Sequence, residues 1–568
     1  MKNTINKRIL CISIISLIFI FIFILSPIVQ ADVTEPEYSD KYKIWLNLSE
    51  EEKKKYIEPI KYDIEYSTNK NNMARMLKSR SKSYFDLRDV ISGMKVKNQM
   101  STSQCWAFST LSSLETNLSL LNDKKNIYDF SERHLEYATS LTFKNNVKNS
   151  IGYNREVGSG GTTLMALSYL TNGTGAIQET DMPFENNENK IEISEIQNKK
   201  TCTKVNDWVI FPNFKSDDTE SKRTEKINNI KSHIEKYGSV FACINTGQSF
   251  YSYYNMATGA YYVPNAQLGD HAVSIIGWDD NYAVENFNSS NRPTKPGAFI
   301  VRNSWGEQFT TDNPNNAGYL FVSYEDPVIG SVLTGIVDSE NKVWYDELYQ
   351  HDKLGINSIM TLSTPKVYAA NMFDKQSAKQ EFITSVSIAI MSEQTCNIYI
   401  NEKNGNLNKN DLKLVYSGTE ELKPGYHTIK LENPIKIIGE KFAVAVEYTC
   451  GNGTAKVGVE NVNTSTYSTE KLESNRSYIS NALNGNWIDL KDGGAIANIK
   501  VFTNNTDGDI DKNGNITIND LSLQRNFILN KIKLSNEQKI KADLDGNGQI
   551  TLNDLAKLRR KILGQDID

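Results

Sequence analysis

The chain is 568 residues long and 39% of its residues are hydrophobic, which is enough for two or three domains that each bury their own core. Its 63 basic and 68 acidic residues leave a formal charge of -5. This near balance excludes a strongly basic protein, so no nucleic-acid partner is predicted.

The first 31 residues have the pattern of an export signal. Basic residues up to Arg8 precede the run from Ile9 to Leu25, which is almost wholly apolar. Val29 and Ala31 supply the small residues of a cleavage site. The alternative is an uncleaved membrane anchor, because the apolar run approaches the length that spans a bilayer. Cleavage would make the protein secreted and extracellular.

Residues 32–80 are polar and charged. Ser49 and Glu52 have the spacing of a capping box, which predicts a helical run through Lys55. Two interpretations stay open for this segment. It is either a removable pro-segment that shields an active site or a solvated N-terminal extension.

Residues 81–338 mix helical and strand patterns, as is typical of an α+β domain. From Cys105 to Leu121, apolar residues recur at helical spacing without Pro or Gly, which predicts a helix. Short apolar runs at Ala272–Trp278 and Gly297–Val301 predict strands in the second half of the domain.

The cysteines point to one candidate nucleophile. An odd number follows the signal, so at least one thiol stays unpaired. Cys202 with Cys243, and Cys396 with Cys450, are candidate disulfides because each pair falls within one predicted domain. That pairing leaves Cys105, which opens the predicted helix where the macrodipole favours a thiolate. The alternative is that Cys105 is a buried small hydrophobic residue.

A cysteine nucleophile needs a histidine partner, and the chain has five histidines. His351 and His427 fall in a β-rich region. His233 lies beside an apolar helical stripe, so we expect it to face solvent. His134 falls in the first turn of a helix, where a cation is disfavoured. His271 precedes a predicted strand and is therefore the best candidate base.

Several motifs surround these residues in order. The first motif spans residues 85–109 and reads FDLRDVISGMKVKNQMSTSQCWAFS. The second surrounds His271 and reads GDHAVSIIGWD, and the third surrounds Asn303 and reads IVRNSWG. Together with Gly160 and Gly161, they resemble the papain family of cysteine peptidases. The resemblance covers roughly residues 84–324, under half of the chain, and implies a papain-like fold with protein or peptide substrates.

The resemblance also implies a role for each matching residue. Cys105 would attack the peptide carbonyl, and His271 would hold it as a thiolate and then protonate the leaving amine. Asn303 would orient the imidazole, and Trp305 would cover their hydrogen bond. The Gln99 side chain and the Cys105 backbone N–H would stabilise the oxyanion. The alternative function is a non-catalytic binding protein or scaffold-bound peptidase regulator with the same fold.

Gly160 and Gly161 would let a substrate strand approach the backbone and pair with it as an added β-strand. The family's common disulfide is missing near this site. Thr102, Ser103 and Gln104 stand where the family has Cys, Gly and Ser, and no cysteine precedes the glycine pair.

In residues 341–503 apolar residues recur at every second position, as from Val386 to Ile390. This alternation predicts the short strands of an antiparallel β-sandwich, and we expect its aromatic residues to lie in the core. Through Tyr349 to Asp352 and its strand content, this region resembles the lectin-like domain that follows the peptidase in some clostridial proteins. The resemblance implies carbohydrate as a hypothetical ligand. Thr503 to Thr506 are predicted to form a polar linker.

Residues 504–568 contain an internal repeat, in which Asp509–Asp520 and Asp543–Asp554 share one pattern of Asp, Asn, Gly and Thr positions. Calcium needs oxygen ligands at fixed loop positions and a glycine at the sixth, so each loop predicts one Ca²⁺ site. A solvated acidic tail is the alternative. The predicted ligands are Asp509, Asp511, Asn513, Asn515, Thr517 and Asp520 in the first loop and Asp543, Asp545, Asn547, Gln549, Thr551 and Asp554 in the second, where Asn515 and Gln549 use backbone carbonyls.

A helical stretch follows each loop, and neither loop is predicted to have the preceding helix of a full EF-hand. With Asp as the last ligand, the repeat resembles the dockerin module that attaches cellulosomal enzymes to cohesins on a scaffold protein. The resemblance implies cohesin contacts through Ile518 and Asn519, or through Leu552 and Asn553, used one pair at a time. It also implies a cellulosome-associated location.

The predicted fold class is therefore multidomain. It combines an α+β papain-like peptidase domain, a β-sandwich domain, and a small all-α dockerin with two calcium loops.

Overall fold

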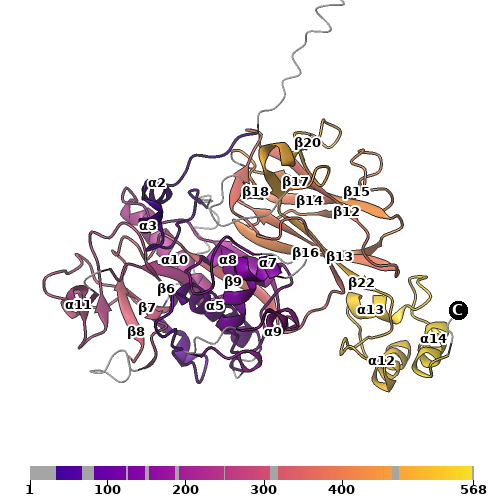
Figure 1. Ribbon diagram of the computed structural model, residues 1–568, viewed down its shortest axis with the longest axis horizontal. Coiled ribbons are helices and arrows are strands. Elements are labelled where there is room, and N and C mark those ends of the chain that lie inside the picture. Colours follow the sequence, from indigo (N-terminus) through magenta and orange to yellow (C-terminus); the bar gives the residue numbers. More distant parts are fainter. Residues whose placement is uncertain are drawn as a thin grey trace, which may run out of the picture.

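Figure 1 shows a computed structural model that describes residues 33–66, 82–122, 124, 126–146, 152–185, 191–247, 250–307, 317–451, 453–462 and 472–565. An α+β domain, a β-sandwich and a small helical domain follow one another along the chain, as predicted. The predicted export signal lies outside the described residues. Within these ranges, no helix combines the length and hydropathy needed to cross a bilayer.

The α+β domain places its helices early and most of its strands late, as the sequence pattern predicts. The helices are α5 (Cys105–Leu121), α6 (Glu132–Ala138), α7 (Leu141–Asn146), α8 (Thr163–Thr171), α9 (Ile193–Gln197), α10 (Glu220–Tyr237) and α11 (Phe250–Tyr253). The strands are β1 (Tyr84–Asp86), β2 (Lys204–Ile210), β3 (Val240–Ile244), β4 (Tyr254–Asn255), β5 (Ala260–Tyr261), β6 (His271–Asp279), β7 (Ala298–Arg302), β8 (Tyr319–Ser323) and β9 (Thr334–Glu340).

Helix α5 is the central helix of this domain and has the predicted bounds. Its residues are buried on all sides from Cys105 to Ser119, because it packs against β6, β9 and α8. Several of its polar side chains form internal hydrogen bonds, as where Ser109 Oγ donates to Val273 O at 2.6 Å. The first residue of α5 is therefore held beside the start of β6.

The β-sandwich confirms the period-two prediction. Its strands are β10 (Glu347–Tyr349), β11 (Ser358–Met360), β12 (Lys366–Asp374), β13 (Glu381–Ile390), β14 (Thr395–Asn401), β15 (Lys413–Ser417), β16 (Gly425–Lys436), β17 (Lys441–Thr449), β18 (Val457–Asn461), β19 (Ser477–Ser480), β20 (Ile488–Asp489), β21 (Ala495–Ala497) and β22 (Ile499–Asn505). One sheet has the order β15-β14-β17-β12-β19-β20, and the facing layer contains β10-β22-β13-β16. Tyr349, Phe373 and Phe442 contact one another in the core between them.

The two larger domains share a sheet, which continues from β16 into β2, β9, β3 and β6. Tyr426 of β16 pairs with Trp208 of β2, and the two rings stack with centroids 6.3 Å apart. A buried ion pair lies at the same junction, with Lys500 Nζ 2.8 Å from an Asp352 carboxylate oxygen. The α+β domain and the sandwich are thus joined by main-chain hydrogen bonds between β16 and β2.

The predicted polar linker is wrong, because Thr503, Asn504 and Asn505 belong to β22 and are buried. Their polar side chains have partners inside the protein. Thr384 Oγ1 donates to Asn504 Oδ1 at 3.2 Å, and Asn504 Nδ2 donates to Trp344 O. Polar composition therefore did not mark solvent exposure here.

The C-terminal domain has helices α12 (Ile518–Ile528), α13 (Asn536–Ala542) and α14 (Leu552–Ile562). Helices α12 and α14 follow the two acidic loops, as predicted. The expectation that no helix precedes either loop is wrong for the second loop, because α13 ends directly before Asp543. Ser535 caps this helix with Gln538 in a capping box, which stabilises a helix too short to show a clear apolar period.

Two further expectations from the sequence are wrong. His233 is buried, with its ring 5.2 Å from those of both Phe211 and Tyr237, because the buried face of α10 is wider than its apolar stripe. Burial lowers the pKa of His233 to about 3 and so keeps it neutral. The candidate disulfides are not formed, and all five described cysteines are thiols.

The N-terminal segment, residues 33–66, lies against the α+β domain and contains α2 (Asp40–Leu46) and α3 (Glu50–Lys53) (Figure 1). Ser49 and Glu52 form the predicted capping box at α3. Tyr42 and Trp45 of α2 are buried together with Leu268, which precedes β6. This part of the segment is packed onto the domain.

Candidate functional site

Cys105 is the first residue of α5 and is 7% exposed. Its thiol lies within hydrogen-bonding reach of the backbone of Ala272, the residue after His271. The helix N-terminus points its unpaired N–H groups toward the thiol, which favours a negative charge there. The elements that carry the predicted nucleophile and base therefore meet at their ends.

The structure joins His271 to Asn303 as the sequence predicts. His271 Nε2 donates to Asn303 Oδ1 over 2.7 Å, which leaves Nδ1 to exchange a proton with a thiol. Asn303 Oδ1 also accepts from the Ser304 N–H at 2.8 Å, and this fixes the orientation of the amide. The Trp305 ring lies 4.6 Å from the imidazole, so it covers the pair as expected.

Gln99 reaches the same site from the segment before α5. Its Oε1 accepts from Ser304 Oγ at 2.6 Å, and its Nε2 donates to Thr102 O at 2.6 Å. Its backbone N–H donates to Ser304 O at 2.7 Å. Ser304 thus ties Gln99 to Asn303, and the second N–H of the Gln99 amide stays available as a donor.

Gly160 and Gly161 lie beside the start of α5. A Cβ at Gly161 would come within 2.6 Å of the Trp106 ring, so only glycine fits this close approach. Gly160 is exposed, and a Cβ added there would lie 4.0 Å from the Ser103 carbonyl oxygen. The predicted substrate-binding pair and the predicted nucleophile are therefore on the same side of the helix start.

Burial disfavours a lone charge on either reacting group. It raises the pKa of the Cys105 thiol to about 11, and it lowers the pKa of His271 against the opposing effect of the Asn303 hydrogen bond. Proton transfer from the thiol to the imidazole would form both charges together, so that each stabilises the other. Exposure of the pair to solvent would lessen the penalty on the charged forms.

The N-terminal segment runs past this site. Ile57 N–H donates to Gly269 O at 2.8 Å, two residues before His271. Ile57, Ile60 and Tyr62 belong to the same buried cluster as Cys105. The segment then reaches the sandwich, where the Tyr62 hydroxyl lies 2.8 Å from Ser358 Oγ.

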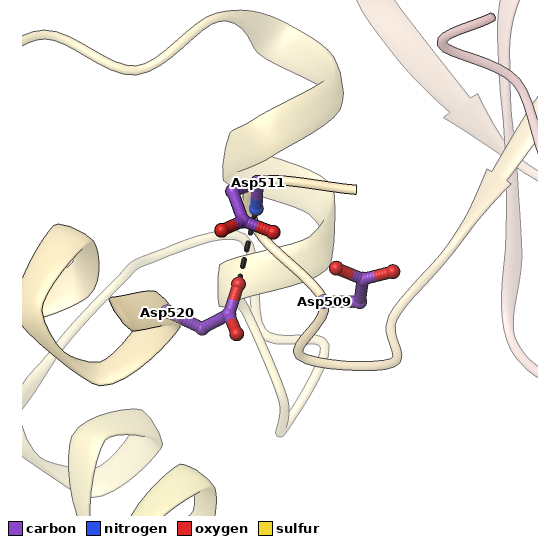
Figure 2. A group of neighbouring side chains, drawn as sticks. All are labelled: Asp509, Asp511 and Asp520. Carbon is purple, nitrogen blue, oxygen red and sulfur yellow. Dashed lines mark hydrogen bonds between the residues drawn. The ribbon is translucent and has the colours of Figure 1, made fainter. Parts of the chain in front are cut away.

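The first acidic loop gathers the carboxylates of Asp509, Asp511 and Asp520, which Figure 2 shows. One oxygen of each lies within 4.8 Å of the others. Asp511 N–H donates to Asp520 Oδ1 at 3.0 Å, and Thr517 and Asp520 form a capping box at α12. An oxygen-rich group of this kind fits a calcium ion.

The remaining predicted ligands of this loop lie next to the carboxylates. Asn513 Nδ2 donates to Asp511 Oδ2 at 2.9 Å, and Asn515 N–H donates to Asn513 Oδ1. Gly514 has φ of 86° at the sixth position, and its N–H donates to Asp509 Oδ2. The turn thus takes the left-handed conformation that the spacing requires.

The second loop repeats these contacts. Asp543, Asp545 and Asp554 form the matching group, and Gly548 has φ of 87°. The other predicted ligands follow the first loop: Asn547 N–H donates to Asp543, Gln549 N–H donates to Asn547, and Thr551 forms a capping box with Asp554. Burial raises the pKa of Asp543, as it does for Asp509 in the first loop.

The predicted partner-binding residues are exposed at the starts of the two helices that follow the loops. Ile518 is 67% exposed and Leu552 is 71% exposed, and both are followed by an exposed asparagine, Asn519 or Asn553. Each loop is thus followed by one exposed apolar side chain and one exposed asparagine at equivalent positions.

Sequence reasoning missed two features of the site. Ser304 links Gln99 to Asn303, and its only sequence signal is its place between Asn303 and Trp305. Arg155 lies under the glycine pair, where its guanidinium contacts the loop backbone. A lone arginine in a polar loop carries no sequence signal of this position.

Comparison with known proteins agrees with this division of the chain. Residues 81–325 match the model of the papain family cysteine protease, residues 348–503 the lectin-like domain, and residues 507–563 the dockerin type I domain. Cathepsin S of Bos taurus is 24% identical over 216 residues, which are 38% of this chain and 53% of that protein. The chain spans about half the length of the curated relatives it matches.

Solved structures extend the likeness to two domains together. The cysteine protease and lectin-like domains of Cwp84, a surface layer associated protein of Clostridium difficile, align with a TM-score of 0.68 and 25% identity. That alignment covers 83% of this chain and 98% of the other. Clostridial Cwp84 after propeptide cleavage aligns with a TM-score of 0.62 and 26% identity, over 74% of this chain and 99% of the other. This chain therefore joins a papain-family cysteine protease domain to a lectin-like domain and a dockerin.

Proposed function

We propose that this chain, in which a papain-family cysteine protease domain precedes a lectin-like domain and a dockerin, is a secreted cysteine endopeptidase. The observation that carries the proposal is the hydrogen bond from His271 Nε2 to Asn303 Oδ1, beside Cys105 at the start of a buried helix. This arrangement orients an imidazole toward a thiol that a helix N-terminus favours as a thiolate.

In this mechanism, Cys105 Sγ gives its proton to His271 Nδ1 and attacks the carbonyl carbon of the scissile peptide bond. The oxyanion accepts hydrogen bonds from the Gln99 amide and the Cys105 backbone N–H. His271 then protonates the leaving amine, which leaves a thioester on Cys105. Water hydrolyses the thioester, with His271 as the base, and restores the thiol.

The direct test is hydrolysis of an unfolded protein by the secreted, processed chain, before and after thiol alkylation. Loss of cleavage on alkylation supports the peptidase. The rival function is a non-catalytic papain-fold binding protein or scaffold-bound peptidase regulator, and it predicts no cleavage at any stage. The presence of Cys105, His271, Asn303 and Gln99 at the described site favours the peptidase.

Gln99→Ala is expected to lower kcat by about 10²–10³-fold, because it removes one of the two oxyanion donors. Steady-state hydrolysis of a peptide substrate measures this effect. The alkylation rate of Cys105 is the control, and it should change little because the substitution leaves the thiol and imidazole in place. A kcat within about twofold of the unmodified enzyme would exclude Gln99 from the oxyanion site.

The N-terminal segment is proposed to be a pro-segment that keeps the enzyme latent. Its hydrogen bond from Ile57 to Gly269, and the burial of Ile60 with Cys105, support this role. In this role, the segment would limit the access of a substrate strand to Cys105, which is 7% exposed while the segment is in place. The solvated-extension alternative is less favoured because the described part of the segment is packed against the domain.

Inhibition by a synthetic peptide of residues 33–66 is expected to weaken as pH rises toward about 7. Burial raises the pKa of Glu58 from its ordinary 4.5 to about 7. Between pH 4.5 and about 7, Glu58 is therefore more fully protonated in the docked peptide than in the free peptide. Docking takes up a proton in this range, so the affinity of the peptide falls by up to about tenfold for each unit that the pH rises. A peptide with Glu58→Gln lacks this titration. The inhibition constants of the two peptides are measured across the pH range, and their ratio cancels the titration of the enzyme itself. A ratio that does not change with pH would contradict the prediction.

The dockerin is proposed to attach the enzyme to a cohesin on a scaffold protein, with two bound Ca²⁺ ions, at an extracellular location such as a cellulosome. The paired acidic loops and the exposed Ile518 and Leu552 support this attachment. The lectin-like match supports carbohydrate as a ligand of the sandwich. A glycan array probed with the intact chain tests that ligand, and lack of retention would leave the sandwich with a stabilising role.

A further inference from the structure

Arg155 is 4% exposed and lies under the loop that carries the glycine pair. Its Nη2 donates to Ser159 O at 2.6 Å and its Nε donates to Gly160 O at 3.2 Å. On the other side of the fork, Nη1 donates to Glu136 O at 2.7 Å, near the end of α6. One planar guanidinium thus joins the loop backbone to a helix of the domain.

The same guanidinium is related to the nucleophile through Trp106. Its central carbon lies 5.1 Å from the centroid of the Trp106 ring, and Gly161 packs against that ring so closely that a Cβ would come within 2.6 Å. Trp106 is fully buried and follows Cys105 directly in α5. The position of the glycine pair is therefore set relative to the thiol by a chain of buried contacts.

A second set of hydrogen bonds supports the loop. Glu136 Oε1 accepts from Gly158 N–H at 2.8 Å and from Gln104 Nε2 at 3.1 Å. Gln104 Nε2 also lies 3.2 Å from Ser159 O. Gln104 is fully buried and precedes Cys105, so the loop is tied to the start of α5 on this side as well. Residues 155–161 contain no cysteine, so the loop is held by these non-covalent contacts.

We propose that Arg155 is a positioning residue that holds Gly160 and Gly161 at the register in which they pair with the main chain of an extended peptide substrate. The proposal rests on the proposed peptidase function. Because Arg155 acts on the backbone of the loop, it affects substrates that extend over the glycine pair. It leaves the reaction of the thiol itself unchanged.

The test compares two substrates of the processed enzyme: a peptide with several residues before the scissile bond, and an amide with a single acyl residue. Arg155→Met is expected to raise KM for the extended peptide about tenfold or more, because it removes the charged donors that hold the carbonyls of Ser159 and Gly160 in place. Hydrolysis of the single-residue amide and the rate of Cys105 alkylation by iodoacetamide should stay within about twofold. Arg155→Lys keeps one compact cation, so its KM for the extended peptide should lie between that of the unmodified enzyme and that of Arg155→Met.

Arg292→Met is the matched control, since Arg292 is exposed and belongs to the segment between β6 and β7. If Arg155→Met does not fold, Arg155→Lys carries the test, and a rise of a few-fold in KM for the extended peptide alone is expected. An unchanged KM for the extended peptide in a folded variant would overturn the proposal. Equal decreases in the hydrolysis of both substrates and in the rate of Cys105 alkylation would also overturn it. An unmodified chain that cleaves neither substrate would overturn the peptidase function, and the positioning role with it.

Discussion

Cys105→Ala is expected to abolish hydrolysis of an unfolded protein substrate, with a loss of at least about a thousandfold in kcat/KM. The thiol is the proposed nucleophile, and no other group at the described site offers a replacement. The fold should be retained, because the substitution removes a single sulfur atom from the end of a helix that is buried along most of its length. Thermal unfolding and hydrolysis of the same preparation measure both effects.

Cys396→Ala is the matched control for this variant. Cys396 is also a buried thiol, but it lies in β14 of the sandwich. Its substitution should leave hydrolysis unchanged. Hydrolysis that survives in Cys105→Ala would refute the assignment of the nucleophile, whereas loss of activity in both variants would point to a general loss of folding.

Removal of calcium is expected to abolish capture of the chain by a cohesin, with a loss of at least about a hundredfold in affinity. In each loop, carboxylate oxygens lie within 4.8 Å of one another, and a bound cation would offset their repulsion. Without the ion, the loops should lose the order that positions Ile518 and Leu552, because metal binding is coupled to folding in small domains of this kind.

Titration of calcium into the chelated chain, followed by circular dichroism and cohesin capture, measures this effect. Chelator already saturated with calcium is the control. Peptide hydrolysis should not change with chelation, because the proposed catalytic groups lie in another domain. Capture that persists in excess chelator would show that the loops do not need the ion.

Local patterns were sufficient to predict the elements that carry the site. The apolar spacing from Cys105 to Leu121 gave the bounds of α5, and the short apolar run at Ala272 gave β6 within one residue. The repeated Asp, Asn and Gly positions gave both acidic loops and the helices that follow them. In each case, residues close in sequence determine the structure.

Features that depend on distant residues could not be predicted in this way. The pairing of β16 with β2 joins two domains through the main chain, and it leaves no periodic signal. Thr503 to Asn505 are polar in sequence but buried, because their partners come from Thr384 and Trp344. His233 is buried by Phe211, which approaches from outside its helix.

In the candidate site, too, features set by local sequence were predicted and contacts between distant segments were not. Cys105, His271 and Asn303 were predicted from motifs, and the hydrogen bond between the last two is present. The contacts of Arg155 with the glycine loop, and of Ile57 with Gly269, join segments that are separate in sequence. Neither residue belongs to a motif or a periodic pattern in the sequence, so only the folded chain reveals these contacts.

Reaction of the processed enzyme with a peptide-like epoxide inhibitor, followed by mass spectrometry of the peptides, tests the peptidase assignment most directly. The account predicts one label per chain, on Cys105, with loss of hydrolysis in proportion to labelling, and little labelling while residues 33–66 remain attached. Full labelling of Cys105 with hydrolysis intact, or inactivation by a label on another residue, would contradict it.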